Sequence, residues 1–281
     1  MDGKRFLGHL VAGLVVLAGT CNGATIDRLR QDGTIRIAYR RDAPPFSYQN
    51  ADAKPAGFIV DLCQAVVTRL SQQLGVPPLK VSYVSVTASD RFDAIQQNKA
   101  DLLCEATTVT LSRLKMIDFS VDTFVDGASL ITTGLTSLRA MAGQKIGVLA
   151  GTTTEQALRN TLSSEGITAT VTPVTTHAEG LTMLDAGKLS AYFADRTILW
   201  VLQASSKAPD KLLLADQYLT IEPYALGLPK DDDDFRYEVD RALSGIYRSG
   251  EIVPILAHTF GDRFQLTPML QSLYLLSAIP D

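Results

Sequence analysis

The sequence predicts an α/β protein built from two lobes. Short apolar segments with the character of strands alternate with segments of helical periodicity along the chain, an arrangement that gives mainly parallel sheets covered by helices. A second series of this kind opens at residues 145–149, after the first has ended. Two extended segments, 129–133 and 224–228, stand singly on either side of the second series. We therefore expect a chain that builds lobe one, crosses a two-stranded hinge to build lobe two, and returns.

The elements of lobe one follow from the spacing of apolar residues. Residues 57–74 are expected to form a helix because Phe58, Leu62, Val66 and Leu70 recur at helical spacing. The other elements expected here are, in order, a strand over 34–39, a turn at Pro44-Pro45, a strand over 81–86, a short helix over 91–98 and a strand over 101–105. Their alternation indicates one sheet with mainly parallel strands.

Lobe two repeats this alternation. Its expected elements are strands over 145–149, 169–174 and 191–194 and helices over 155–162 and 178–185, with the turn 150–154 between the first strand and its helix. The predicted division of the chain is lobe one at 25–131 and 229–281 and lobe two at 132–228.

The segment after lobe two is expected to be helical. Asp231 to Asp234 precede a helix over 235–249, and an acidic run at that position suits the positive end of the helix dipole better than it suits a metal site. Within 265–281, Leu266, Met269, Leu270, Leu273 and Leu276 indicate a short helix folded onto lobe one. The sequence suggests no function for this tail.

The N-terminus has the composition of an export signal. Lys4 and Arg5 precede an apolar run at 10–18 that is too short to span a bilayer. Small residues then predict cleavage near the end of residues 1–24, while Cys21 leaves a lipid anchor as an alternative. We expect the mature protein in the periplasm.

Charge and cysteine content exclude several classes of protein. Without residues 1–24 the chain has 24 basic and 29 acidic side chains, a balance that argues against nucleic acid or an anionic membrane as partner. Cys63 and Cys104 remain; in an oxidising compartment this pair favours a disulfide over two buried free thiols. Two thiols and scattered histidines do not make a zinc site, so no metal or cofactor is expected.

One segment carries the first indication of function. A hydroxyl-rich turn with Thr107, Thr108 and Thr110 follows the strand 101–105 and leads to Arg113. Hydroxyls and amides beside a guanidinium can bind a small carboxylate. A capped helix start with a solvated arginine would show the same pattern, so other segments must decide between the two.

Six segments together resemble the periplasmic solute-binding proteins of ABC importers, in the polar amino-acid family. They occur in the family's order and cover nearly all of the mature chain: APPFSY (43–48), GFIVDLC (57–63), DLLCEATTVTLSR (101–113), IDFS (117–120), GVLAGTTTE (147–155) and AYFADR (191–196). The resemblance implies the type II, or Venus-flytrap, architecture, in which two α/β lobes close on a ligand at the hinge.

The resemblance also implies a grip on an α-amino acid. It assigns the ligand α-carboxylate to Arg113 and Thr108 in one lobe and to the turn with Thr152 and Thr153, at a helix start, in the other. A guanidinium and a helix N-terminus both favour an anion.

The α-ammonium is assigned to Asp195, with the carbonyl of Ala106 sharing it. Asp195 has a simpler explanation as a cap at the end of a strand. Arg113 and Asp195 together would hold the two charged ends of a zwitterion, which requires that they face one cavity.

The side-chain pocket resembles that of the glutamate/aspartate-binding subgroup. The matching residues are Arg40, Arg91 and His177, which could neutralise a distal carboxylate; taken singly, they could be surface charges and a helix cap. Two positions depart from the subgroup: Ala88 stands where a serine is expected, and Glu105 where glycine is frequent. An inward Glu105 would repel an acidic ligand or recruit a cation.

The resulting hypothesis is a monomeric, extracytoplasmic amino-acid-binding protein that delivers glutamate or aspartate to a membrane permease. One alternative is a cyclohexadienyl dehydratase, which resembles these binders and would need Glu179 or Glu105 as general acid. Another is a ligand-binding sensor module. The sequence leaves acidic, amide and other polar amino acids open as ligands.

Overall fold

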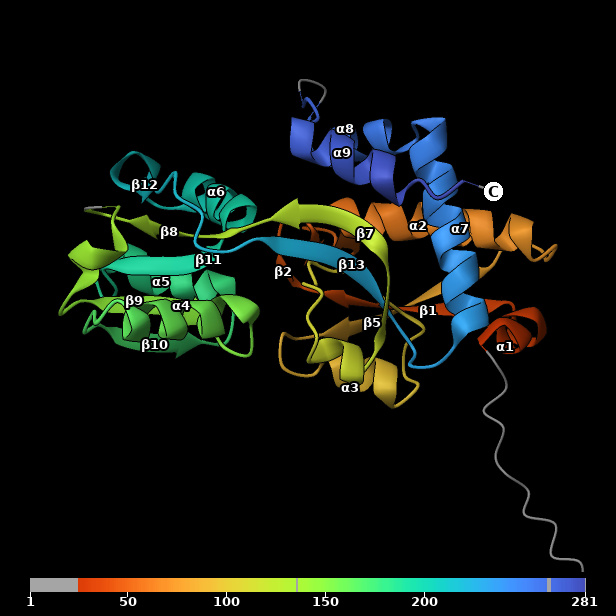
Figure 1. Cartoon of the computed structure of the whole chain (residues 1–281), viewed down its shortest axis with the longest axis horizontal. Coiled ribbons are helices and arrows are strands. Elements are labelled where there is room, and N and C mark those ends of the chain that lie inside the picture. The colour runs from red at the N-terminus through yellow and green to blue at the C-terminus, as the bar shows by residue number, and fades with distance from the viewer. Residues whose placement is uncertain (1–24, 135, 262–263, 281) are drawn as a thin grey trace, which may run out of the picture.

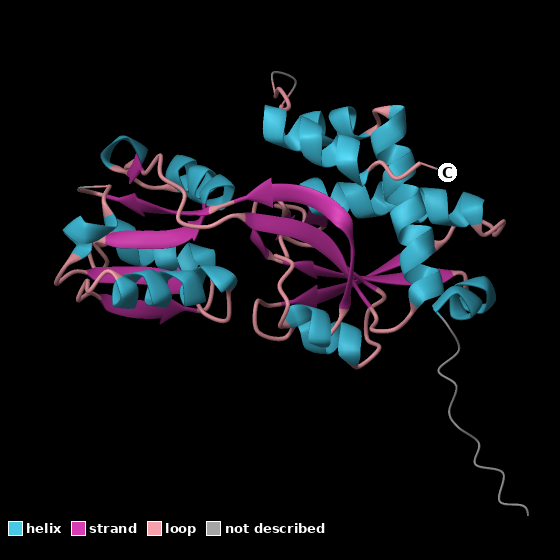
Figure 2. Ribbon diagram, viewed as in Figure 1, coloured by secondary structure: helices cyan, strands magenta, loops and turns pink. Residues whose placement is uncertain are grey.

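Two five-stranded sheets, one in each lobe, form the framework of the protein (Figures 1 and 2). The computed structural model describes residues 25–134, 136–261 and 264–280, so the expected signal peptide and Cys21 lie outside the described residues. The first sheet has the order β5 (Lys80–Val86), β1 (Thr34–Arg40), β6 (Leu102–Leu103), β13 (Glu222–Leu228) and β7 (Asp118–Asp126). The second has the order β10 (Thr170–Val174), β9 (Lys145–Leu149), β11 (Ala191–Asp195), β8 (Ala128–Thr132) and β12 (Leu213–Leu214).

Helices cover both sheets, as the alternating pattern predicts. Lobe one has α1 (Thr25–Asp32), α2 (Phe58–Gln73), α3 (Arg91–Gln96), the short η1 (Arg113–Lys115), α7 (Asp233–Ser249), α8 (Ile252–Phe260) and α9 (Pro268–Ser277). Lobe two has η2 (Leu138–Met141), α4 (Thr153–Ser164), α5 (His177–Asp185), α6 (Arg196–Ser205) and η3 (Pro209–Lys211). The described helices include none that is long and apolar enough to cross a membrane.

A small third sheet was not predicted. It consists of β2 (Asp42–Ala43), β3 (Ser47–Gln49) and β4 (Pro55–Ala56), paired antiparallel. Strands of two or three residues are too short to show an alternating pattern in the sequence. The peptide bond between Pro44 and Pro45 within this sheet is cis.

The central strands run parallel, and their carboxyl ends place the functional residues. β1 pairs parallel with β5 and β6 in the first sheet, and β9 pairs parallel with β10 and β11 in the second. Ligands of such sheets bind beyond the carboxyl ends of the strands. Arg40 ends β1 and Asp195 ends β11, so each lobe presents site residues at the corresponding edge of its sheet.

The two lobes are joined by two crossing segments that lie side by side (Figure 1). β7 continues through Gly127 into β8, and the chain returns through residues 216–221 into β13. The amide of Ala128 donates to the Thr220 hydroxyl at 2.9 Å. A Cβ at Gly127 would lie 2.4 Å from the Thr220 carbonyl oxygen, so this close approach requires glycine.

Sheet membership differs from the expected lobe boundaries. β8 belongs to the second sheet and β13 to the first, whereas the sequence suggests changes of lobe at 131/132 and 228/229. We propose that the lobes divide at Gly127 and within 216–221. An apolar strand pattern shows that a segment is buried, but it does not show which sheet the segment joins.

The tail packs on lobe one. The Tyr274 hydroxyl of α9 donates to the Thr123 carbonyl at 3.1 Å, and Leu270 is buried beside it. Met269 and Leu276, which the sequence suggests as buried, are 58% and 82% exposed. The expected helix is therefore present, but Leu270 and Tyr274, four residues apart, set its buried face.

Candidate ligand-binding site

All nine residues that the sequence predicts as ligand contacts line one cavity to which both lobes contribute. They are Arg40, Arg91, Ala106, Thr108, Arg113, Thr152, Thr153, His177 and Asp195. Hydrophobic residues of lobe two, including Leu149, Phe193 and Ile198, complete the wall. The cavity volume is about 20 Å³, roughly the space for one or two water molecules. What these residues bind stays a prediction.

Arg113 forms the positive pole of the cavity. It is 8% exposed, and its Nη1 donates to the Thr108 carbonyl oxygen at 2.7 Å. The guanidinium carbon lies 5.2 Å from the centre of the Phe92 ring. Burial lowers the pKa of Arg113 from its usual value, but an arginine remains charged at neutral pH. The side chain is thus held in place before a ligand arrives.

The start of α4 faces Arg113 from lobe two. The Thr152 hydroxyl caps this helix by accepting the amide of Glu155 at 3.1 Å. The Thr153 hydroxyl donates to Glu222 Oε2 at 2.9 Å and lies 3.3 Å from the Thr108 hydroxyl. Thr153 therefore links the lobes across the cavity, while the helix dipole adds partial positive charge.

Asp195 forms the negative pole. Its Oδ2 accepts the Tyr224 hydroxyl at 2.6 Å, and its Oδ1 accepts the Thr154 hydroxyl at 3.1 Å. Burial, followed by the nearby carboxylates of Asp126 and Glu222, raises the pKa of Asp195 to about 7. In the described part of the chain, the Asp195 carboxylate accepts side-chain hydrogen bonds only from hydroxyl groups. A cationic ligand group would lower this pKa and stabilise the carboxylate.

Two buried arginines lie at another part of the cavity wall. Arg40 donates through Nε and Nη2 to Asp42 Oδ1 at 2.9 and 2.7 Å. Arg91 donates through Nη1 to the carbonyl of Ala88. Ala88 stands where the subgroup has a serine, and its backbone supplies a hydrogen-bond acceptor. Burial lowers the pKa of Arg91 to about 10. Both side chains are almost fully enclosed.

His177 is a buried, neutral member of the site and not an exposed cap. Its Nδ1 lies 3.0 Å from the Tyr192 hydroxyl, and a Cβ at Gly180 would lie 2.2 Å from the Tyr192 ring. Burial, together with the charge of Arg40, lowers the pKa of His177 to about 3. The imidazole can therefore offer a hydrogen bond to a ligand but no charge at neutral pH.

Other residues contribute to the site besides the nine predicted contacts. Glu105 is fully buried beside Arg40 and Arg91, which is the inward orientation that the sequence left open. Tyr224 and Glu222 reach the site from β13. Nothing in their local sequence signals these contacts, because the partners Asp195 and Thr153 are distant along the chain.

The predicted disulfide is confirmed. Cys63 of α2 is bonded to Cys104, with a Cα–Cα distance of 6.4 Å. Cys104 directly precedes Glu105 and the hydroxyl-rich turn, so the bond ties this part of the site to the helix layer of lobe one. In the described part of the chain no group of three or more His, Cys, Asp or Glu side chains could hold a metal ion.

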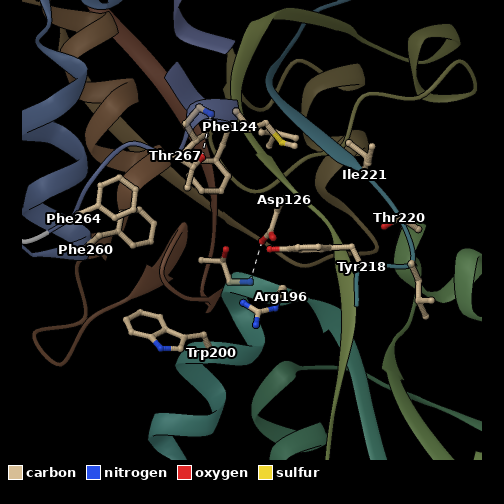
Figure 3. A pocket seen from close by; sticks show the side chains of 15 residues that line it. Phe124, Asp126, Arg196, Trp200, Tyr218, Thr220, Ile221, Phe260, Phe264 and Thr267 are labelled. Atoms are coloured by element: carbon tan, nitrogen blue, oxygen red, sulfur yellow. Dashed lines mark hydrogen bonds between the residues drawn. The ribbon is translucent and has the colours of Figure 1, made fainter. Parts of the chain in front are cut away.

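A second, larger cavity lies at the hinge, with a volume of about 1080 Å³ (Figure 3). Aromatic side chains, including Phe260 and Trp200, form part of its lining. Among its charged groups, Asp126 accepts the amide of Thr197 at 3.1 Å, and Arg196 pairs with Asp216 at 3.0 Å. None of the nine residues predicted as ligand contacts lines this cavity.

Two α/β lobes that enclose a cavity lined by Arg113 from one lobe and Asp195 from the other are the arrangement of a two-lobed binding protein. Residues 35–262 match the model of the bacterial extracellular solute-binding proteins, family 3, so the chain belongs to this family.

Relatives of known name agree with this assignment. The L-glutamate/L-aspartate-binding protein of Pseudomonas aeruginosa is 31% identical over 232 residues, which are 81% of this chain and 77% of the relative. The glutamate/aspartate import solute-binding protein of Escherichia coli K12 is 27% identical over 83% of this chain and 78% of the relative. The structure of an ancestral arginine-binding protein bound to glutamine superimposes with a TM-score of 0.71 and 25% identity, covering 82% of this chain and 99% of that one.

Proposed function

We propose that this protein captures a polar α-amino acid in the periplasm, with glutamate and aspartate as primary ligands, and delivers it as a monomer to the permease of an ABC importer. The observation that carries the proposal is the pair Arg113 and Asp195, which line one cavity from different lobes. The carboxylate of a zwitterion bound between them would pair with Arg113, and its ammonium would pair with Asp195. The relatives named for glutamate and aspartate support the choice of ligand.

Ligand entry requires the lobes to separate. The cavity volume of about 20 Å³ is too small for an amino acid, and two hydrogen bonds between lining residues and β13 join the lobes: Asp195 with Tyr224 and Thr153 with Glu222. Rotation about the paired crossing segments would break these contacts. A bound amino acid would replace them with charge-assisted bonds and favour the closed form.

The affinity expected from this grip matches a transport function. Charge-assisted hydrogen bonds contribute about 1.5–3 kcal/mol each. Four to six of them would contribute roughly 6–18 kcal/mol, from which the costs of association and lobe closure are subtracted, and a micromolar dissociation constant requires a net value of roughly 8 kcal/mol. A micromolar affinity is therefore expected when most of these bonds form.

The dehydratase alternative lacks a suitable general acid. Glu179 is exposed, and its carboxylate accepts the amide and the hydroxyl of Thr175, both at 2.8 Å; these bonds lower its pKa. Glu105 is fully buried and is ion-paired with two arginines. Neither of the two is among the described residues that line the cavity, where a general acid would have to meet its substrate.

Thermal-shift and calorimetric titration of the mature protein against the common amino acids would test the proposal. Glutamate or aspartate at a hundred times its dissociation constant should stabilise the protein by about 2.7 kcal/mol. Stabilisation by basic amino acids alone would contradict the ligand assignment. Turnover of prephenate or arogenate would show an enzyme instead, and binding of other metabolite classes without amino acids would favour a sensor module.

A further inference from the structure

Glu105 places a protein carboxylate where the side chain of an acidic ligand was expected to find two free arginines. Its side chain is fully buried. Oε1 lies 3.2 Å from Arg91 Nε and accepts the Thr107 hydroxyl. Oε2 lies 3.8 Å from Arg40 Nη1. The carboxylate thus stands between the two cations that line this part of the cavity.

The arginines are largely neutralised before a ligand arrives. Arg40 also holds Asp42, at 2.9 and 2.7 Å, so Arg40 and Arg91 face the carboxylates of Asp42 and Glu105. An additional buried carboxylate from a ligand would have no cation of its own and would lie close to Glu105. Uncompensated buried charge and repulsion between like charges both weaken binding. This arrangement opposes strong selectivity for acidic side chains.

Two buried polar atoms at this place still lack a hydrogen-bond partner among the residues that the structure describes: Arg91 Nε, a donor, and Glu105 Oε2, an acceptor. A primary carboxamide offers one acceptor and two donors on a single planar group. Its oxygen can accept from Arg91, which lines the cavity, and because the group is uncharged it is not repelled by Glu105 behind that arginine. A carboxylate can also accept from Arg91, but its charge is repelled by Glu105.

We infer that Glu105 is a specificity-determining residue that lowers the affinity for acidic side chains and allows the carboxamides glutamine and asparagine to compete with glutamate and aspartate. The inference rests on the proposed function, because it takes the Arg113 and Asp195 grip on the α-amino acid as given. It predicts a broad polar ligand range for this chain.

The test is a calorimetric comparison of glutamate and glutamine on the wild-type protein and Glu105→Gln. This substitution keeps the size of the side chain and removes its charge. Wild-type protein should bind glutamine no more than tenfold more weakly than glutamate. Glu105→Gln should tighten glutamate binding and shift the ratio of the two dissociation constants at least tenfold towards glutamate.

Glu251→Gln provides a matched control. Glu251 is also a glutamate of lobe one in an ion pair with an arginine, at 2.6 Å from Arg69, but Arg69 is not among the residues that line the cavity, whereas Arg40 and Arg91 are. Its substitution should leave the ratio within threefold of the wild-type value. Thermal unfolding of each variant checks that it is folded. If Glu105→Gln does not fold, the ratio of the two dissociation constants of the wild-type protein still tests the inference.

The possible failures can be told apart. If the wild-type protein binds neither amino acid, the proposed function is wrong and the inference falls with it. If both bind but glutamate is preferred more than tenfold by the wild-type protein, or Glu105→Gln changes the ratio less than threefold, only the role of Glu105 is wrong.

Discussion

Replacing Arg113 by methionine should remove most of the affinity for every amino acid. Nη1 of Arg113 is engaged by the Thr108 carbonyl, which leaves other N–H groups of the guanidinium for a ligand carboxylate. Two charge-assisted bonds at about 1.5–3 kcal/mol each give a loss of about 3–6 kcal/mol. This loss corresponds to a dissociation constant raised by roughly a hundredfold to ten-thousandfold. Methionine retains an unbranched stem beside Phe92, so the fold should persist.

Titration calorimetry measures the loss, and the protein's single tryptophan provides a second signal. Trp200 lies on α6 of lobe two and lines the hinge cavity opposite Phe260 of lobe one (Figure 3). It is 54% exposed, so a change in the angle between the lobes should alter its fluorescence. Ligand should change the emission of the wild-type protein but not that of Arg113→Met at the same concentration.

The control is Arg139→Met, which removes the same charge from a side chain that is 73% exposed and pairs with Glu165. It should bind amino acids as the wild-type protein does. Binding by Arg113→Met within threefold of wild type would refute the assignment of Arg113 to the ligand α-carboxylate.

Three further predictions follow from the site and its supports. Because the pKa of Asp195 is raised to about 7 and a ligand ammonium would lower it, binding at pH 6 should release protons, and affinity should rise with pH until about 7. Calorimetry in buffers of different ionisation enthalpy would show this release, and Asp195→Asn should abolish it. Reducing the Cys63–Cys104 bond, which closes 41 residues, should lower the free energy of unfolding by about 4 kcal/mol, measurable by denaturant titration. Gly180→Ala should destabilise the protein by about 1–3 kcal/mol in thermal unfolding, because the added methyl group meets the Tyr192 ring.

Each of these predictions has its own control. The raised pKa also implies that the free protein loses stability as pH rises from about 4 to 7, since the folded state holds a proton that the unfolded state has released; a flat profile that Asp195→Asn leaves unchanged would contradict it. A Cys63→Ala, Cys104→Ala double variant should not respond to reductant. Gly134→Ala, where an added Cβ has no neighbour within 4 Å, should be close to neutral.

Local sequence pattern was sufficient for most regular elements. The predicted helix 57–74 is observed as Phe58–Gln73, and the predicted strand 145–149 as Lys145–Leu149. The sequence also predicted a capping segment: Asp232 accepts the amide of Phe235 at the start of α7. The helix itself begins two residues earlier than predicted. Such features depend on residues within a few positions of each other, so the sequence displays them directly.

The candidate site residues came from short motifs, which also act locally. Arg113 and Asp195 were chosen because each stands in a segment that resembles a known family, and both line the predicted cavity. The short motif around Glu105 did not predict which way its side chain points. Its segment leaves open whether the carboxylate points outward or between Arg40 and Arg91, and those arginines belong to other elements.

What the sequence by itself determined is therefore the α/β class, the alternating strands and helices of the two sheets except for β7, β12, α1, α6 and α8, the disulfide partners, and the pair Arg113 and Asp195 that lines the cavity. Only the tertiary structure decided which sheet β8 and β13 join and how Tyr224 and Glu222 join the lobes. The Thr153–Glu222 contact joins residues 69 positions apart. The physical reason is that periodicity and capping are encoded between near neighbours, whereas ion pairs and sheet partners form between segments that only the folded chain brings together.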